Sequence, residues 1–133
     1  MRKALLVGID YYAKVSPLFG CVNDAHSVKS VLERNSDGTV NFGVKLFTGT
    51  SPAESITRAN LKEGVRELFA DDSEIALFYF AGHGYVEMTG GYLCGSDCET
   101  GDDGLPLDAV LTLANHSSLD YSLILLAKEE RML

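Results

Sequence analysis

The chain has 133 residues, of which 46% are hydrophobic and 23% charged, a composition typical of one globular domain with a single core. Its 11 basic and 19 acidic side chains give a formal net charge of −8 at pH 7, which argues against nucleic-acid and anionic-membrane partners. No apolar run approaches the roughly 20 residues that span a bilayer. The three cysteines lack the spacing of a disulfide framework. We therefore expect one domain, residues 1–133, with reduced thiols in the cytoplasm.

Strand-like and helix-like segments alternate along the chain. Four mostly apolar runs are predicted to be strands: residues 4–9, 42–47, 74–81 and 121–126. The first, third and fourth have the composition of buried strands. Apolar side chains at helical spacing predict three helices: residues 23–34, 57–69 and 107–115. Residues 85–106 are expected to form a loop with a short extended piece at 92–94. This alternation predicts an α/β sheet with helices on its faces.

Capping side chains suggest where the first two helices start. Asn23 and Asp24 carry side chains that commonly begin a helix. The segment 51–54 resembles a capping box with proline at the first helical position. Thr57 competes with it, because a cleaner apolar stripe follows that residue. We favour Thr57 as the start of the second helix and assign the earlier residues to a turn.

The third apolar run stops on a histidine between two glycines, in the stretch FYFAGHG at 78–84. Glycines let the backbone turn sharply and let other groups approach it closely. An imidazole in this place would lie at the carboxyl end of a buried strand, where open α/β sheets keep their active sites. Two interpretations of His83 follow: a functional imidazole, or a half-buried polar side chain that hydrogen-bonds a loop.

Five stretches occur in the order and at the intervals of caspase-like cysteine peptidases: ALLVGIDYY (4–12), LFGCVNDAHSV (18–28), TRANLKEGVRELF (57–69), ALFYFAGHG (76–84) and YLCGSD (92–97). Together with the last strand they extend the match over residues 4–126, and the chain most resembles metacaspases and their bacterial relatives. The resemblance implies a caspase-like three-layer sandwich, a mostly parallel sheet with helices on both faces. Here it would be incomplete, with about four main strands.

The resemblance also implies peptide-bond hydrolysis by a Cys/His dyad. His83 matches the family's histidine, which withdraws the thiol proton and later protonates the leaving amine. The backbone N–H of Gly84 matches the oxyanion-hole donor. In metacaspases an acidic pocket selects arginine or lysine before the cleaved bond. The stretch GCVNDA matches the lining of that pocket, so Asp24 would be its carboxylate and Cys21 part of its wall.

Three of these positions also have plainer interpretations. Asp24 could cap the first helix, and it could do so while serving the pocket. Cys21 could be a small buried thiol. Ala81 stands where the family often has serine, so one hydroxyl of the basic-residue pocket is absent.

Calcium activates many metacaspases through aspartates in the loops after the histidine. Asp97 falls at one matching place and Asp108 near another, but the paired aspartates of that pattern are reduced to Asp108-Ala109. Calcium needs six to eight oxygen ligands, so this partial pattern does not predict a calcium site. Cys94 and Cys98 are too few for structural zinc. We therefore expect neither a metal nor another cofactor.

The family's nucleophilic cysteine follows the fourth strand, in Asp-Cys-x-Ser-Gly or a close variant. Here the strand continues as AKEERML at 127–133, without cysteine, serine or threonine. We therefore expect a domain shortened before its catalytic cysteine. No spacing directs Cys21, Cys94 or Cys98 at His83, so none of the three is expected to replace the missing nucleophile.

Three accounts fit that expectation. The chain could be the histidine-bearing part of a peptidase whose cysteine lies on another chain. It could be a non-catalytic caspase-like domain that binds basic peptides or regulates a true peptidase. Its tail could also replace a native continuation.

The family's sheet order is 2-1-3-4-5-6, so a chain without the last two strands would leave its fourth strand as an apolar edge. Such edges pair with other chains. We therefore expect self-association through residues 121–127, YSLILLA.

A reading from another class is a flavodoxin-like receiver or nucleotide-binding domain, since these also alternate strands and helices. VGIDYY at residues 7–12 lacks a glycine-rich phosphate loop, and its first strand lacks the paired acids of a phosphoacceptor site. The partner that the resemblance to metacaspases implies is a peptide or protein with a basic residue.

Overall fold

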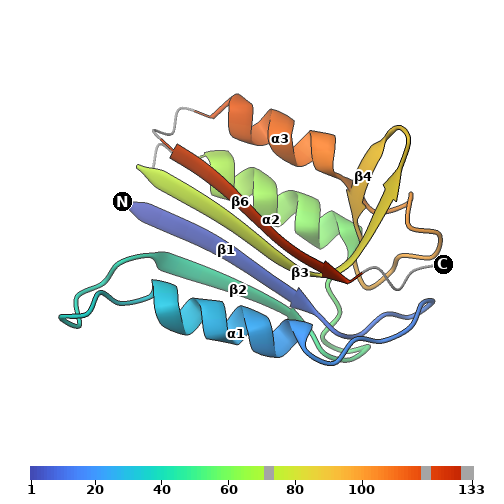
Figure 1. Cartoon of the computed structure of the whole chain (residues 1–133), viewed down its shortest axis with the longest axis horizontal. Helices are drawn as coiled ribbons and strands as arrows, with labels where there is room; N and C mark the ends of the chain where they lie inside the picture. The colour runs from blue at the N-terminus through green and yellow to red at the C-terminus, as the bar shows by residue number, and fades with distance from the viewer. Residues whose placement is uncertain (71–73, 118–120, 130–133) are drawn as a thin grey trace.

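A computed structural model describes residues 1–70, 74–117 and 121–129 of the chain. Its helices and strands follow in this order: β1 (Arg2–Ile9), α1 (Cys21–Leu32), β2 (Gly43–Gly49), α2 (Arg58–Ala70), β3 (Ile75–Glu87), β4 (Gly90–Leu93), β5 (Leu105–Pro106), α3 (Leu107–Asn115) and β6 (Tyr121–Glu129). Figure 1 shows their arrangement.

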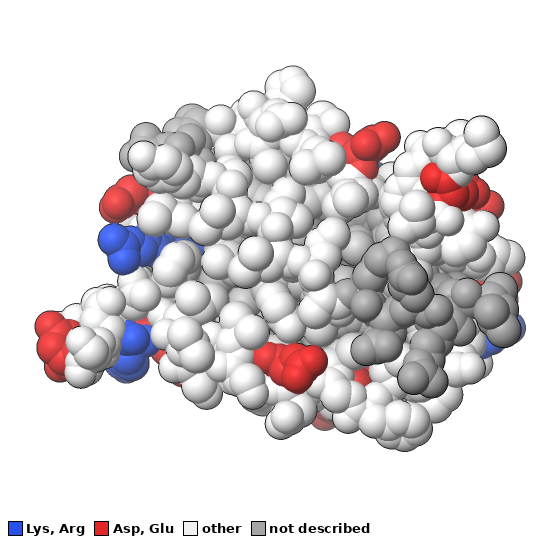
Figure 2. All heavy atoms as spheres, viewed as in Figure 1, with Lys and Arg blue, Asp and Glu red and all other residues white. Residues whose placement is uncertain are grey.

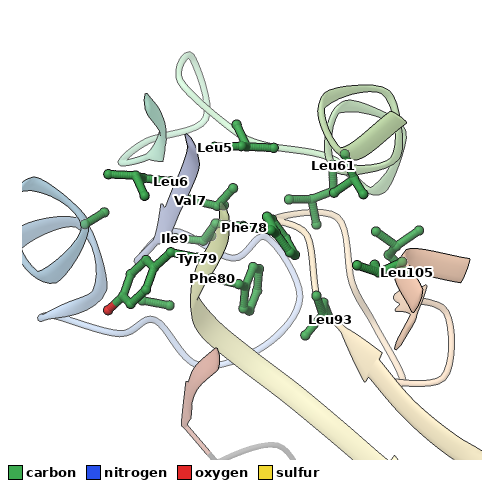
Figure 3. Close-up of a cluster of buried hydrophobic side chains, with 14 of the residues drawn as sticks. Leu5, Leu6, Val7, Ile9, Leu61, Phe78, Tyr79, Phe80, Leu93 and Leu105 are labelled. Carbon is green, nitrogen blue, oxygen red and sulfur yellow. The ribbon is translucent and has the colours of Figure 1, made fainter. Parts of the chain in front are cut away.

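The main sheet is parallel and has the strand order β2-β1-β3-β6. Helix α1 packs on β1, β2 and β3, whereas α2 packs on β1 and β3 and also contacts α3. In Figure 3 the ribbons of α1 and α2 lie on opposite sides of the strands. The molecule is therefore the α/β arrangement expected from the sequence: an incomplete three-layer sandwich with helices on both faces.

Strand β3 corrects the prediction that the third strand ends before His83. It continues to Glu87, and from Gly84 onward it pairs antiparallel with β4. Strands β4 and β5 then pair with each other, so the predicted loop at 85–106 is in part a small antiparallel sheet. The sequence concealed this extension because Tyr85, Val86 and Glu87 do not form an apolar run. His83 thus lies where the parallel part of β3 passes into the hairpin with β4. Figure 1 shows that hairpin.

The first helix begins two residues earlier than predicted, at Cys21. Its first N–H groups find a partner outside the helix: the backbone N–H of Cys21 donates to Oδ1 of Asp10 at 2.9 Å. Asn23 and Asp24 make no capping hydrogen bond, because both already lie inside the first turn. The cap predicted from these two residues is therefore wrong, and Asp10 takes that role.

The second helix confirms Thr57 as its starting signal. Oγ1 of Thr57 accepts the backbone N–H of Asn60 at 3.2 Å, and Oδ1 of Asn60 accepts the backbone N–H of Thr57 at 2.9 Å. This reciprocal pair has the logic of a capping box. Oδ1 of Asp97 accepts a further helix N–H, that of Arg58, at 3.0 Å.

Core side chains alternate between the two faces of the central strands (Figure 3). Leu6 and Tyr79 point toward α1. The opposite face packs against α2 through another set: Leu5, Phe78 and Phe80, with Leu61 of the helix itself. Both faces of β1 and β3 are thus covered, which explains why these strands are continuously apolar in the sequence.

Strand β6 forms the outer edge of the parallel sheet among the described strands. Ile124 packs on the core, whereas Tyr121, Leu123 and Leu125 remain 67%, 47% and 49% exposed. Figure 2 shows that the middle of this face of the molecule carries few charged side chains. The sheet therefore offers both an open backbone edge and an apolar strip at β6.

Helices long and apolar enough to cross a membrane are absent from the described part of the chain.

Candidate active site

His83 is fully buried at the carboxyl end of the parallel part of β3. The loop that joins β1 to α1, residues 10–20, folds against it. Nε2 of His83 lies 2.8 Å from the backbone carbonyl oxygen of Ser16. The ring of Tyr12 packs edge-on against the imidazole, with the two ring centroids 4.6 Å apart. One loop thus holds the imidazole through both a hydrogen bond and a ring contact.

The contact with Ser16 fixes the tautomer of His83. A carbonyl oxygen only accepts hydrogen bonds, so Nε2 must carry the proton and donate it. In the neutral ring Nδ1 then holds the lone pair. Nδ1 is buried and has no hydrogen-bond partner in the described part of the chain. Buried polar atoms are nearly always paired, so an acceptor nitrogen without a donor is an unusual feature of this position.

Cys94 and Cys98 lie in the loop after β4, with their thiols engaged there. Sγ of Cys98 donates to Oδ1 of Asp103 at 3.1 Å, and Sγ of Cys94 lies 3.9 Å from the carbonyl oxygen of Gly101. Hydrogen bonding with the Cys94 thiol, burial and the Asp103 carboxylate together raise the pKa of Cys98 far above its ordinary value. Such a thiol forms thiolate poorly and is a weak nucleophile. Neither thiol is paired with Nδ1 of His83.

The end of β6 lies beside His83. In the parallel ladder between β3 and β6, His83 is in register with Glu129. Residues in register on neighbouring parallel strands share a face of the sheet, about 4.8 Å apart. The register therefore places the end of β6 and His83 side by side in the sheet.

The N–H of Gly84 faces away from β4. The backbone N–H of Cys94 donates to the carbonyl oxygen of His83 at 3.0 Å, so these two residues occupy a hydrogen-bonding position. Antiparallel ladders alternate, which makes the next pair, Gly84 with Leu93, a non-hydrogen-bonded one. The N–H of Gly84 is thus directed away from the hairpin, adjacent to the imidazole. It points to the side on which β3 pairs with β6, where the ladder reaches His83 and Glu129.

The predicted pocket residues occupy the start of α1 and the facing strand. Cys21 is buried at the first position of the helix, and Asp24 is exposed one turn later. Ala81 is buried in β3, in register with Gly8 of β1. Burial, and then the nearby charges of Asp24 and Cys21, raise the pKa of Tyr79. Tyr79 therefore belongs to the same neighbourhood, which sequence reasoning missed because the residue looked like ordinary core.

Two of the acidic residues after the histidine, Asp97 and Asp103, have structural partners. Asp97 holds the start of α2, as described above, and Asp108 is exposed in the first turn of α3. Oδ2 of Asp103 accepts the backbone N–H of Glu99 at 2.8 Å, and its Oδ1 accepts that of Gly101 at 3.2 Å. In the described residues, no three His, Cys, Asp or Glu side chains gather closely enough to hold a metal ion.

Comparison with known proteins identifies the family. A family model described as the caspase domain matches residues 1–127. The chain belongs to the caspase domain family. This family comprises cysteine peptidase domains of caspase and metacaspase type.

Several fungal metacaspases are similar to this chain. Metacaspase-1 of Cryptococcus neoformans is 34% identical over 86 residues, which cover 62% of this chain and 19% of that protein. Metacaspase-1 of Kluyveromyces lactis is 33% identical over 86 residues, covering 62% and 20%. Metacaspase-1A of Aspergillus fumigatus is 32% identical over 87 residues, covering 62% and 21%. The chain spans about a fifth of the length of these curated relatives.

Proposed function

We propose that this caspase domain supplies the histidine half of a Cys/His peptidase centre, with the nucleophilic thiol placed at the end of β6 by residues outside these 133. The observation that carries the proposal is the buried Nδ1 of His83, a proton acceptor without a donor. The register of β3 with β6 supports the location of the missing thiol.

The chemistry follows from the tautomer. Nδ1 of His83 accepts the thiol proton while Nε2–H stays on the Ser16 carbonyl, which steadies the imidazolium. The thiolate attacks the peptide carbonyl carbon, and the N–H of Gly84 stabilises the resulting oxyanion. The proton on Nδ1 then passes to the leaving amine as the C–N bond breaks. Water hydrolyses the thioester with the same imidazole as base, which regenerates the thiol.

Asp24 gives the proposed site a preference for arginine or lysine before the cleaved bond. It is an exposed carboxylate at the start of α1, with Cys21 beneath it and Ala81 on the facing strand. A guanidinium forms a charge-assisted, two-pronged hydrogen bond with such a carboxylate. Ala81 offers no hydroxyl to this pocket.

A non-catalytic role as a basic-peptide-binding or regulatory domain is the second candidate. It is favoured by the thiols themselves, because Cys94 and Cys98 are engaged within their own loop. In that case the pocket would operate without the dyad.

Peptide binding and turnover separate these possibilities. We expect the 133-residue chain to bind an arginine-containing fluorogenic peptide without cleaving it, with or without calcium, and Asp24→Asn to weaken binding about tenfold. Asp108→Asn, an exposed acid in the first turn of another helix, is the matched control and should bind normally. Turnover that a thiol-reactive inhibitor and His83→Gln both abolish would show that Cys21, Cys94 or Cys98 is the nucleophile, contrary to the proposal.

We also propose that the 133-residue chain self-associates through β6. The strand combines an open edge with the exposed side chains of Tyr121, Leu123 and Leu125. A second copy can add its own β6 to this edge and cover the apolar strip. Light scattering at high micromolar concentration should show dimers or larger species, which Leu123→Lys should dissociate. A monomer throughout that range would refute this part of the proposal.

A further inference from the structure

The hydroxyl of Tyr12 takes the place of a backbone hydrogen bond between β3 and the residue that follows β4. The N–H of His83 donates to Oη of Tyr12 at 2.8 Å, and that hydroxyl donates to the carbonyl oxygen of Cys94 at 3.2 Å. The return bond, from the N–H of Cys94 to the carbonyl oxygen of His83, is direct at 3.0 Å. A regular antiparallel pair would exchange two direct bonds. Here a side chain is inserted into one of them, at the histidine itself.

The neighbouring glycine makes room for this insertion. A Cβ on Gly82 would lie 2.6 Å from Oη of Tyr12 and 2.9 Å from the ring of Phe80. Both distances are too short for real atoms, so any larger residue would displace the hydroxyl. Tyr12 is only 5% exposed, and its ring lies edge-on to the imidazole. Hydroxyl and ring therefore hold both the backbone and the side chain of His83.

The hydroxyl stays protonated, as this double role requires. Burial raises the pKa of Tyr12 well above its ordinary value, and the hydrogen bond from the His83 backbone opposes this only in part. An ionised tyrosine could accept from His83 but could not donate to Cys94. The bridge is therefore intact at any pH at which a peptidase of this kind would work.

We propose that Tyr12 is the positioning residue of His83. It fixes the backbone at His83 and the plane of the ring, so that Nε2 meets the Ser16 carbonyl and Nδ1 is left for the thiol. This inference rests on the proposed function, in which Nδ1 is the base. Tyr12 touches neither substrate nor nucleophile in this role and acts only through His83.

The test is Tyr12→Phe, which keeps the ring contact and removes only the bridging hydroxyl. Nitrogen-15 NMR of the imidazole, in mildly alkaline solution where histidine is neutral, reports its tautomer. We expect the wild-type chain to show Nε2–H alone and Tyr12→Phe to show a mixture of both tautomers. Exchange of the His83 backbone N–H should also become about tenfold faster, because a buried hydrogen bond is lost. Tyr11→Phe removes a hydroxyl from the adjacent residue and should change neither signal.

Gly82→Ala gives the same test with every Tyr12 atom retained, should the first variant fold poorly. An unchanged tautomer in folded Tyr12→Phe or folded Gly82→Ala would overturn the inference about Tyr12 and leave the proposed function standing. A wild-type imidazole protonated on Nδ1 would instead overturn the proposed function. A merely structural role would lower stability in these variants without altering the tautomer.

Discussion

Gly8→Ala is expected to destabilise the chain by about 3 kcal/mol, at the upper end of what overpacking a core usually costs. A Cβ at Gly8 would lie 2.4 Å from the backbone carbonyl oxygen of Cys21 and 2.9 Å from Cβ of Ala25. Backbone atoms at the start of α1 cannot move aside cheaply, because Asp10 holds the N–H of Cys21 at 2.9 Å. Helix α1 must therefore shift off the sheet. Urea unfolding followed by circular dichroism measures the loss.

Gly20→Ala is the control for this prediction. Gly20 also lies at the start of α1, but a Cβ there would meet no atom within 4 Å. The free energy of unfolding of Gly20→Ala should stay within about 0.5 kcal/mol of the wild-type value. Equal losses of stability in the two variants would contradict the claim that Gly8 is needed for the close approach of α1 to β1.

The same shift should disturb the proposed pocket. Gly8 is in register with Ala81, and the helix that it admits carries Cys21 and Asp24. Whatever stability Gly8→Ala retains, we expect its affinity for an arginine peptide to fall more than that of Gly20→Ala.

The sequence predicts those parts of the fold whose signal is periodic apolar burial. This signal correctly predicts β1, α3 and the apolar part of β3. Both faces of these strands are covered by other elements, and one face of the helix is covered. The apolar stripe after Thr57 also predicts the start of α2 correctly, and the structure adds a capping pair between Thr57 and Asn60. The second half of β3 was missed because its side chains at Tyr85, Val86 and Glu87 alternate without a buried partner face.

Some residues of the candidate site can likewise be predicted from the sequence, and others cannot. His83 stands out in the sequence, since glycines flank it after an apolar strand. The groups that hold it do not: the Ser16 carbonyl is a backbone atom, and Tyr12 lies 71 residues away along the chain. Asp10 caps α1 from a loop, whereas Asn23 and Asp24 only looked like caps. Contacts of this kind depend on how loops fold back, which no local pattern records.

A thiol placed opposite His83 should become reactive. Glu129→Cys puts it in register with the imidazole, so Nδ1 can take its proton and the resulting ion pair stabilises the thiolate. An unperturbed thiol has a pKa of about 8.5, and a neighbouring imidazolium lowers it into the range of roughly 3.5–7.5. The thiolate fraction in slightly acidic solution then rises by about tenfold or more. Lys128→Cys is tested beside it, because position 128 is in register with Gly82 and not with the histidine.

The most direct test of this account is the alkylation rate of that thiol by iodoacetamide near pH 6.5, followed by mass spectrometry of the peptide that contains it. The account predicts that Glu129→Cys reacts about tenfold faster than Ser122→Cys, a control at the far end of β6 in register with Ala76, and that His83→Gln removes the difference. Equal rates at positions 122, 128 and 129, or an excess that survives His83→Gln, would contradict the claim that His83 is a base poised for a thiol at the end of β6.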